Sequence, residues 1–218
     1  MHPLVTVVDG ALPAGLARRL LRAVQALGDR RLAQTYQTTF WHPLGAPPAC
    51  QVEVAAQQLL HHLPPRLRRG VVGVEWWLSR MRTSLVQVDF HRDRDNSTFA
   101  RSGRTRHPRV ASVLYLNRCR GGLLAVTEEP PCPENPALAP SRHDFDLVQP
   151  APNRYAFFSG SLTHGVLDAE NRIPGARLPR EPGLRLAVAL NFWARRPAGV
   201  PRFEPERLAA ARWLRGLL

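Results

Sequence analysis

The chain of 218 residues contains no lysine, so all of its 30 basic side chains other than histidine are arginines. Cysteine is also scarce: Cys50, Cys119 and Cys132 are scattered and odd in number. Three isolated cysteines argue against a disulfide framework, fit a reducing compartment and match the spacing of no zinc motif. The sequence also lacks an apolar run long enough to span a membrane. We therefore expect no disulfides, no cysteine-type zinc site and no contact with a membrane.

The first ten residues, MHPLVTVVDG, have no charged leader, no long apolar segment and no small-residue cleavage site. This absence of a targeting signal predicts a cytoplasmic protein. Hydrophobic residues make up 44% of the chain and charged residues 22%, which is ordinary for a soluble globular protein. A chain of this length favours one domain with a substantial core, so residues 1–218 are expected to form a single domain.

The formal net charge is +13. An excess of this size should attract polyanions or acidic peptides and speed their encounter with the protein. A solvated basic surface with no such partner is the other interpretation. Exclusive use of arginine together with much alanine, leucine and proline is typical of a coding bias.

The first third of the sequence indicates a strand and two helices. Residues 4–8 favour a short strand, and Pro13 stands near the first position of a helix. That helix has an apolar face made of Leu16, Leu20, Leu21, Val24 and Leu27. A second helix is expected from about 49 to 63, ended by Pro64 and Pro65. Between the helices, Trp41, His42 and Pro43 are expected in a connection.

After Gly70 the pattern changes to short apolar segments separated by Gly, Pro, Asn and Asp. The expected strands are 71–80, 84–90, 109–117, 122–127, 145–149, 154–158, 163–167 and 184–193. Eight strands after two helices predict a mainly β jelly roll braced by helices, with support over about 1–70 and a core over about 71–195. A last helix is expected at 204–218, and long loops are expected at 92–108, 128–143 and 168–183.

The segment VQVDFHRD, residues 86–93, is an apolar strand that ends in His-x-Asp. Residues two apart in an extended chain point to the same side, so His91 and Asp93 can offer an imidazole and a carboxylate to one ion. A second segment, YAFFSGSLTHGV at 155–166, supplies His164 beside another strand. Two imidazoles and one carboxylate on one face of iron leave three positions for a bidentate 2-oxo acid and O₂. A closed structural zinc site would not leave that room.

Taken alone, each part of this pattern is common. Most His-x-Asp triplets are surface residues, and a lone histidine is usually an ordinary hydrogen-bonded one. Asp89 and Asp95 compete with Asp93. Asp89 lies two residues before His91 and therefore shares its strand face, and Asp95 falls in a polar loop. What favours a metal site is the order of features, which runs from His-x-Asp through His164 to an arginine that opens an apolar strand.

That arginine is Arg185, and the run LAVALNFW follows it. Its planar guanidinium binds a carboxylate through two parallel hydrogen bonds, and a buried arginine needs such an anion. Both properties suit the far carboxylate of 2-oxoglutarate. A surface charge at a strand edge is the other interpretation. Arg172, Arg177 and Arg180 precede it, but only Arg185 begins an apolar strand.

Residues from about 72 to 193 resemble the prolyl-4-hydroxylase-like branch of the 2-oxoglutarate oxygenases. The stretches that carry the resemblance are FHRD at 90–93, RVASVLYLN at 109–117, GGLLAV at 121–126, YAFFSGSLTHGV at 155–166 and RLAVALNFW at 185–193. The resemblance implies a double-stranded β-helix of the jelly-roll, cupin-like type. It also implies Fe(II), 2-oxoglutarate and O₂, with succinate, CO₂ and a hydroxylated substrate as products.

Position by position, the resemblance implies that the metal ligands of the catalytic centre are His91, Asp93 and His164. It implies Arg185 as the 2-oxoglutarate anchor. Tyr115 stands where a tyrosine of the family commonly donates its hydroxyl to the same co-substrate, and a core tyrosine is the alternative. Val113 and Leu123 are expected to line the co-substrate pocket, unless they only fill the core.

The sequence departs from the family pattern in places. Met81 and Arg82 stand near a position where the family often has a tyrosine, and the gap from His164 to Arg185 is longer than usual. The nucleic-acid demethylase branch typically has a second arginine shortly after the anchor, and residues 186–193 contain none. Halogenating relatives lack the carboxylate, so Asp93 favours hydroxylation.

The substrate is the least determined part. Residues 92–109 carry six arginines and begin at the expected metal site, so they are either a lid that contacts substrate or a solvated loop. Four aromatic residues are candidates for stacking on a substrate, although tryptophan in strands is usually core: Trp41, Trp76, Trp77 and Phe99. We expect a peptide, a protein side chain or an amino-acid-like small molecule. The other classes are a nucleic-acid-binding protein or an oxidative demethylase of a modified base, and a non-catalytic jelly-roll module.

Overall fold

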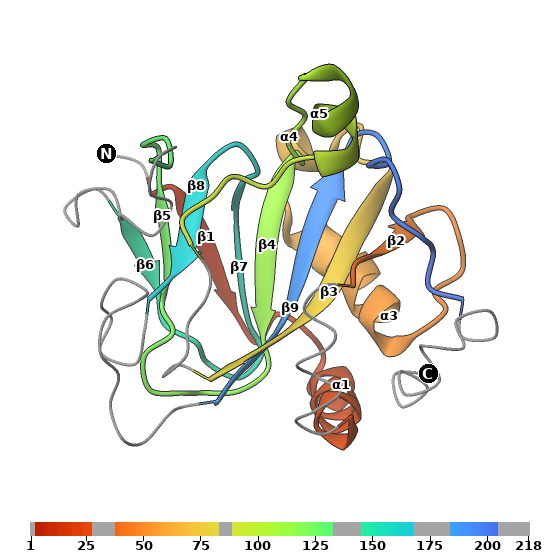
Figure 1. The fold of residues 1–218 in the computed structure, drawn as a ribbon. Coiled ribbons are helices and arrows are strands. Elements are labelled where there is room, and N and C mark those ends of the chain that lie inside the picture. Colours follow the sequence, from red (N-terminus) through yellow and green to blue (C-terminus); the bar gives the residue numbers. More distant parts are fainter. Residues whose placement is uncertain (1–2, 28–37, 83–88, 133–144, 168–183, 205–218) are drawn as a thin grey trace.

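The computed structural model of the chain describes residues 3–27, 38–82, 89–132, 145–167 and 184–204, and every structural statement below concerns these residues. Two antiparallel sheets face each other, and helices cover the outer side of the larger one (Figure 1). Within the described part of the chain, no helix has the length and apolar character needed to cross a bilayer.

The larger sheet has six strands, and its order brings distant segments together. From one edge to the other they are β1 (Val5–Asp9), β7 (Arg154–Ser159), β4 (Val110–Tyr115), β9 (Leu184–Trp193), β3 (Gly73–Arg82) and β2 (Phe40–Pro43). Side chains of a strand alternate between the two faces. On β9, Leu186, Val188, Leu190 and Phe192 enter the core under the helices. The intervening residues Arg185, Ala187, Ala189 and Asn191 therefore face the smaller sheet.

The smaller sheet has three strands in the order β6 (Asp146–Val148), β5 (Leu124–Thr127) and β8 (Thr163–Val166). Its inner face packs against the larger sheet in a cluster that includes Leu124, Val126 and Phe158. Much of the opposing surface is made of alanine, at Ala111, Ala156 and Ala187. These small side chains leave space between the sheets.

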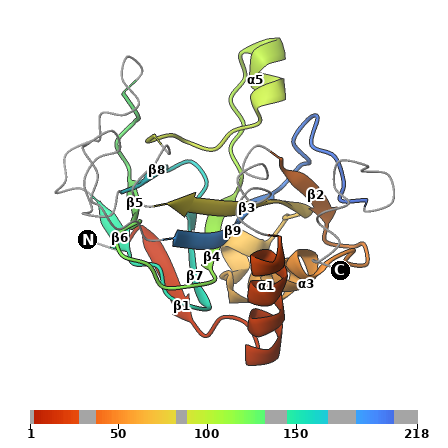
Figure 2. The ribbon, with the colours of Figure 1, turned by 60° about the horizontal axis from the view of Figure 1, so that its bottom comes forward.

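The helices that cover the outer face of the larger sheet are α1 (Ala14–Ala26), α3 (Gln51–Leu59), η1 (Leu60–His62) and α4 (Pro65–Arg68). A further helix is α5 (Asn96–Ser102). The apolar face predicted for the first helix is buried, with Leu16, Leu20 and Val24 almost without exposure. Figure 2 shows α1 and α3 on one side of the larger sheet and α5 on the other. The helical support and the candidate site thus lie on opposite faces.

The mainly β, jelly-roll prediction is confirmed by these two facing sheets, but two local expectations are wrong. Phe40–Pro43 is the strand β2 rather than a connection, because it pairs along Gly73–Trp76 of β3. The expected loop 92–108 contains α5, which begins where the Asp95 carboxylate accepts a hydrogen bond from Thr98 N. The predicted loop 168–183 and most of the predicted strand 84–90, loop 128–143 and helix 204–218 lie outside the described residues.

Candidate metal centre and co-substrate pocket

His91 and His164 face each other across a single antiparallel bridge at the edge of the smaller sheet. His91 N donates to the His164 carbonyl at 3.0 Å, and His164 N donates to the His91 carbonyl at 2.9 Å. Residues directly opposite each other in such a pair project to the same face. The two imidazole centroids are accordingly 4.4 Å apart.

Asp93 completes the cluster from the same side of the chain as His91. Its Oδ1 lies 3.5 Å from His91 Nε2 and its Oδ2 lies 3.5 Å from His164 Nε2. The intervening Arg92 points away, with Nε bonded to Thr163 Oγ1 at 3.0 Å. Two donor atoms each about 2.1 Å from one ion are at most roughly 4.2 Å apart, so both separations suit a shared metal. No other group of three such side chains converges within the described residues.

The hydrogen bonds of the two rings fix which nitrogen is available to an ion. His91 Nδ1 lies 2.8 Å from the Asp89 carbonyl, and His164 Nδ1 lies 3.3 Å from the Leu162 carbonyl. A carbonyl oxygen only accepts, so each Nδ1 carries the proton and each Nε2 presents a lone pair. This outer support orients imidazoles in metal sites.

Burial and charge set the protonation of the cluster. Burial lowers the pKa of His164 to about 4, against the charge of Asp93, so this ring is neutral at neutral pH. Burial alone would lower the pKa of His91 as well. The hydrogen bond and the charge of Asp93 outweigh burial, so the pKa of His91 is raised above its usual value. The two histidines hold the pKa of Asp93 at about 2 although burial opposes them. A carboxylate and a neutral imidazole are the forms that bind a metal.

The two competing aspartates lie elsewhere. Asp89 is exposed and contributes only its backbone carbonyl, to His91. Asp95 is buried, and its carboxylate accepts hydrogen bonds from Thr98 and from Ala198 N. Asp95 therefore holds the start of α5 against the segment after β9. Of the three aspartates, only Asp93 joins the cluster.

A narrow pocket of about 70 Å³ runs from the cluster between the sheets to Arg185. The Arg185 side chain is buried, with Nε bonded to the Gly122 carbonyl at 3.2 Å and Nη1 to Ser79 Oγ at 3.3 Å. In the part of the chain that the structure describes, no carboxylate lies within ion-pair distance of this guanidinium. The pocket thus ends in an uncompensated positive charge.

Tyr115 lies beside that charge. The Arg185 Cζ atom is 5.0 Å from the centre of the Tyr115 ring. The Tyr115 hydroxyl is buried and makes no hydrogen bond of good geometry in the described structure. Burial raises the pKa of this phenol, although Arg185 opposes the shift. A buried hydroxyl without a partner is costly, so both groups are suited to an anionic ligand.

The remaining predicted pocket residues divide by strand alternation. Val113 of β4 lines the narrow pocket, as expected. Leu123 does not, because it lies on the outer face of the smaller sheet with Phe90 and Ala125. Its neighbour Leu124 lines the pocket instead, together with Met81 of β3.

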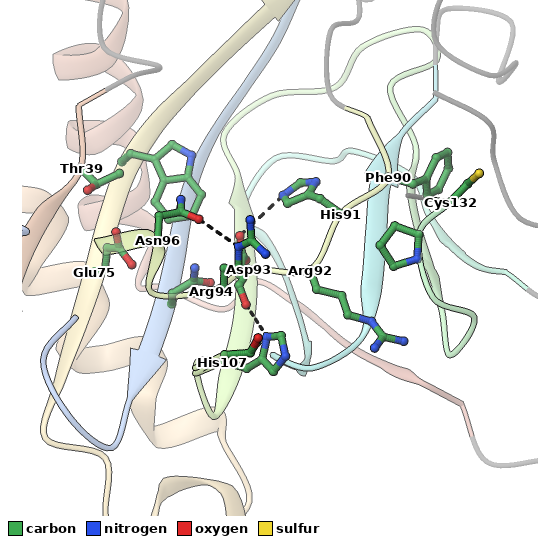
Figure 3. Close-up of a pocket in the computed structure, with 14 residues that line it drawn as sticks. Thr39, Glu75, Phe90, His91, Arg92, Asp93, Arg94, Asn96, His107 and Cys132 are labelled. Carbon is green, nitrogen blue, oxygen red and sulfur yellow. Dashed lines mark hydrogen bonds and ion pairs between the residues drawn. The ribbon is translucent and has the colours of Figure 1, made fainter. Parts of the chain in front are cut away.

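A wider cavity of about 830 Å³ opens outward from the same cluster (Figure 3). Its lining residues other than the cluster include Thr39, Glu75, Trp77, Arg94, Asn96, His107 and Asn191. Sequence reasoning missed Glu75 and Asn191. The alternation of side chains along each strand could have indicated both residues. Glu75 lies on the same face of β3 as Trp77 and Ser79, and Asn191 lies on the same face of β9 as Arg185.

The four aromatic residues considered for stacking differ in position. Trp41 and Trp76 are buried in the core. Trp77 lines the wider cavity and the narrow pocket. The ring of Phe99 lies under the guanidinium of Arg94, at 3.8 Å. Only Trp77 is therefore placed to meet a ligand at the cluster.

Known structures share this architecture. A prolyl-4-hydroxylase from Pseudomonas putida aligns over 89% of this chain and 89% of its own, with 20% identity and a TM-score of 0.52. A prolyl 4-hydroxylase from Phytophthora capsici aligns over 94% of this chain and 63% of its own, with 17% identity and a TM-score of 0.51. No protein-family model matches the sequence, and no curated protein is significantly similar to it. The chain therefore has the fold of the prolyl 4-hydroxylases, as its motifs predict.

Proposed function

We propose that the chain is an Fe(II)- and 2-oxoglutarate-dependent dioxygenase that hydroxylates a peptide, a protein side chain or an amino-acid-like small molecule. His91, Asp93 and His164 hold the iron, and Arg185 with Tyr115 holds the far carboxylate of 2-oxoglutarate. Succinate and CO₂ are the co-products. The single observation that carries this proposal is the joining of a two-histidine, one-carboxylate cluster to an uncompensated buried arginine by one narrow pocket.

The donor set fits iron. Two neutral imidazole nitrogens and one carboxylate on one side of an ion are typical of non-haem Fe(II) oxygenases with open coordination positions. In this chain both Nδ1 protons are committed to backbone carbonyls, so the Nε2 atoms are presented without rearrangement. When bound, the iron supplies the activation of O₂ for oxidation of the substrate.

The protein's own groups do the positioning. Arg185 offers charge and two-point hydrogen bonding to a carboxylate, and Tyr115 offers a buried hydroxyl beside it that makes no hydrogen bond of good geometry. The apolar side chains of Met81, Val113, Leu124 and Val166 line part of the pocket between Arg185 and the cluster. A dicarboxylate can thus place one end at Arg185 and the other at the cluster.

The test is formation of succinate from 2-oxoglutarate by the purified chain with Fe(II), ascorbate and O₂, read by mass spectrometry. We expect turnover in the wild type and none in His91→Ala or Asp93→Ala, although both variants fold. Wild-type activity in His91→Ala, or a wild type that binds neither Fe(II) nor Mn(II), would end the proposal.

A further inference from the structure

The wider cavity contains a carboxyl group that the proposed chemistry does not use. Glu75 of β3 lines this cavity together with Asp93, and Figure 3 shows it on the side of β3, next to Thr39. Trp193 Nε1 donates to Glu75 Oε2 at 3.1 Å, and the Thr39 side chain also hydrogen-bonds to this carboxyl. These two neighbours orient the carboxyl group, but neither carries a positive charge.

The arginines that line the cavity are engaged elsewhere. Arg92 binds Thr163 Oγ1 and the Glu128 carbonyl. Arg94 lies over the Phe99 ring and donates to Asn96 Oδ1 at 3.2 Å. Among the described residues, no basic side chain comes within ion-pair distance of Glu75. In a chain with 30 basic and 17 acidic residues, this carboxyl is left without a cation.

Its surroundings disfavour a negative charge. Burial raises the pKa of Glu75 to about 7, and Asp93 and Asp95 add to the rise, against the hydrogen bonds from Thr39 and Trp193. An opposite charge within reach would favour the ionised carboxylate, and a neutral group would not. A ligand that brings a cation therefore gains an interaction here that a neutral ligand of the same shape lacks.

We propose that Glu75 determines substrate specificity by binding a positively charged nitrogen group, the ammonium or guanidinium of a basic side chain, in the cavity beside the metal centre. This inference rests on the proposed function, since it takes that cavity for the substrate site. The volume of about 830 Å³ accommodates a long side chain with its flanking backbone. Asn96 and His107 also line the cavity and offer polar groups to that backbone.

The experiment uses a set of capped tripeptides that share glycine flanks and differ in the central residue. The two informative pairs are arginine against citrulline and lysine against norleucine, because each pair has similar shape and differs in charge. Peptide binding to the Mn(II)- and 2-oxoglutarate-loaded chain is measured by calorimetry without O₂, and succinate formation is measured separately with Fe(II).

We expect the charged member of each pair to bind roughly 10- to 100-fold more tightly to the wild type, as for hydrogen bonds to charged groups. Glu75→Gln keeps the size and the acceptor for Trp193 but loses the charge, so it should erase this difference. The matched control is Glu128→Gln, which removes an exposed carboxylate outside the cavity and should retain it. Thermal unfolding checks that both variants fold.

The outcomes distinguish the role of Glu75 from the proposed dioxygenase function. Succinate formation with no preference for the charged peptides, or a preference that survives in Glu75→Gln, overturns the role of Glu75 and leaves the dioxygenase proposal standing. Charge-selective binding that depends on Glu75, without succinate from any peptide, supports the cation site and contradicts the proposed chemistry. If no charged peptide binds more tightly than its neutral partner, the inference is wrong even without any variant.

Discussion

The guanidinium of Arg185 lies 5.0 Å from the ring centre of Tyr115, and the hydroxyl of that tyrosine is buried and makes no hydrogen bond of good geometry in the described structure. A cation and a buried hydroxyl therefore lie side by side, and the cation lines the narrow pocket. Since both lack their natural partner, the energetic effects of changing them should depend on whether 2-oxoglutarate is present.

Arg185→Ala should weaken 2-oxoglutarate binding by roughly 3–5 kcal/mol, because it leaves the ligand's carboxylate buried and unpaired. Calorimetric titration of the Mn(II)-loaded protein measures this. Arg172→Ala, Arg177→Ala and Arg180→Ala are the controls and should bind 2-oxoglutarate like the wild type. Normal affinity in Arg185→Ala would place the anchor at another residue.

Tyr115→Phe should have opposite effects in the two states. Without ligand, removing an unsatisfied buried hydroxyl should leave the free energy of unfolding unchanged or raise it by up to about 1 kcal/mol. With saturating 2-oxoglutarate, the loss of one hydrogen bond of about 0.5–1.5 kcal/mol should reduce the stabilisation by the ligand. Denaturant unfolding with and without 2-oxoglutarate tests both, and an equal loss in the two conditions would mean that Tyr115 only fills the core.

The two neighbouring aspartates should separate metal binding from stability. Asp93→Ala should abolish binding of Mn(II), and the metal-free variant should still unfold cooperatively. Asp95→Ala should retain metal binding and lose about 1–2 kcal/mol of stability, because it removes the N-cap of α5 and the hydrogen bond to Ala198 N. Metal titration and denaturant unfolding of both variants check the contrast, and loss of metal in Asp95→Ala alone would reverse the assignment.

Glu75 should make stability depend on pH. Because its pKa in the folded state is raised from 4.5 to about 7, the folded protein binds this proton more tightly than the unfolded chain. This tighter proton binding contributes up to about 3 kcal/mol to the free energy of unfolding. The contribution is fully present below about pH 4.5 and is lost as the pH rises through 7. Glu75→Gln should not show this loss, so its stability relative to wild type should increase over that range. A constant difference between wild type and variant from pH 4.5 to 8 would refute the raised pKa.

The arginines of the 92–109 segment allow a test of the nucleic-acid alternative. Binding of a duplex through Arg101, Arg104 and Arg106 should fall with rising salt, with a slope of about −0.9 in log affinity per log salt for each phosphate contacted. Replacing all three with Gln should weaken it and leave 2-oxoglutarate binding intact, since none of them lines the narrow pocket. Absence of duplex binding by the wild type at low salt would identify the charge as a solvated surface.

The parts of the site that were predictable from sequence are those that depend on local spacing. His91 and Asp93 lie on one side because they are two apart in an extended segment, and Arg185 enters the pocket because it alternates with the apolar residues of β9. The eight apolar segments likewise carry enough turn signals to indicate facing sheets. Such features need no knowledge of contacts between distant segments.

The parts that were not predictable depend on pairing across the fold. Phe40–Pro43 becomes a strand only because β3 supplies a partner, and Glu75 becomes a cavity residue only because the sheet order places β3 beside β9. The position of Leu123 was missed by one residue, which in a strand moves a side chain to the opposite face. Helix α5 depends on Asp95 as its N-cap. From the sequence alone, an aspartate in a polar segment could equally be a helix cap or a metal ligand.

The bridge between His91 and His164 has a consequence for the kinetics of metal exchange. Its two hydrogen bonds are an isolated pair rather than part of a continuous ladder, so the backbone of the segment that carries His91 and Asp93 pairs with the smaller sheet only there, and the Arg92 side chain adds bonds to Thr163 and to the Glu128 carbonyl. Opening at that point separates the carboxylate and one imidazole from the other imidazole without unfolding either sheet. Release of the ion should then be governed by this local opening rather than by global unfolding. The amide protons of His91 and His164 should exchange with solvent far more slowly in the metal-bound protein than in the metal-free one.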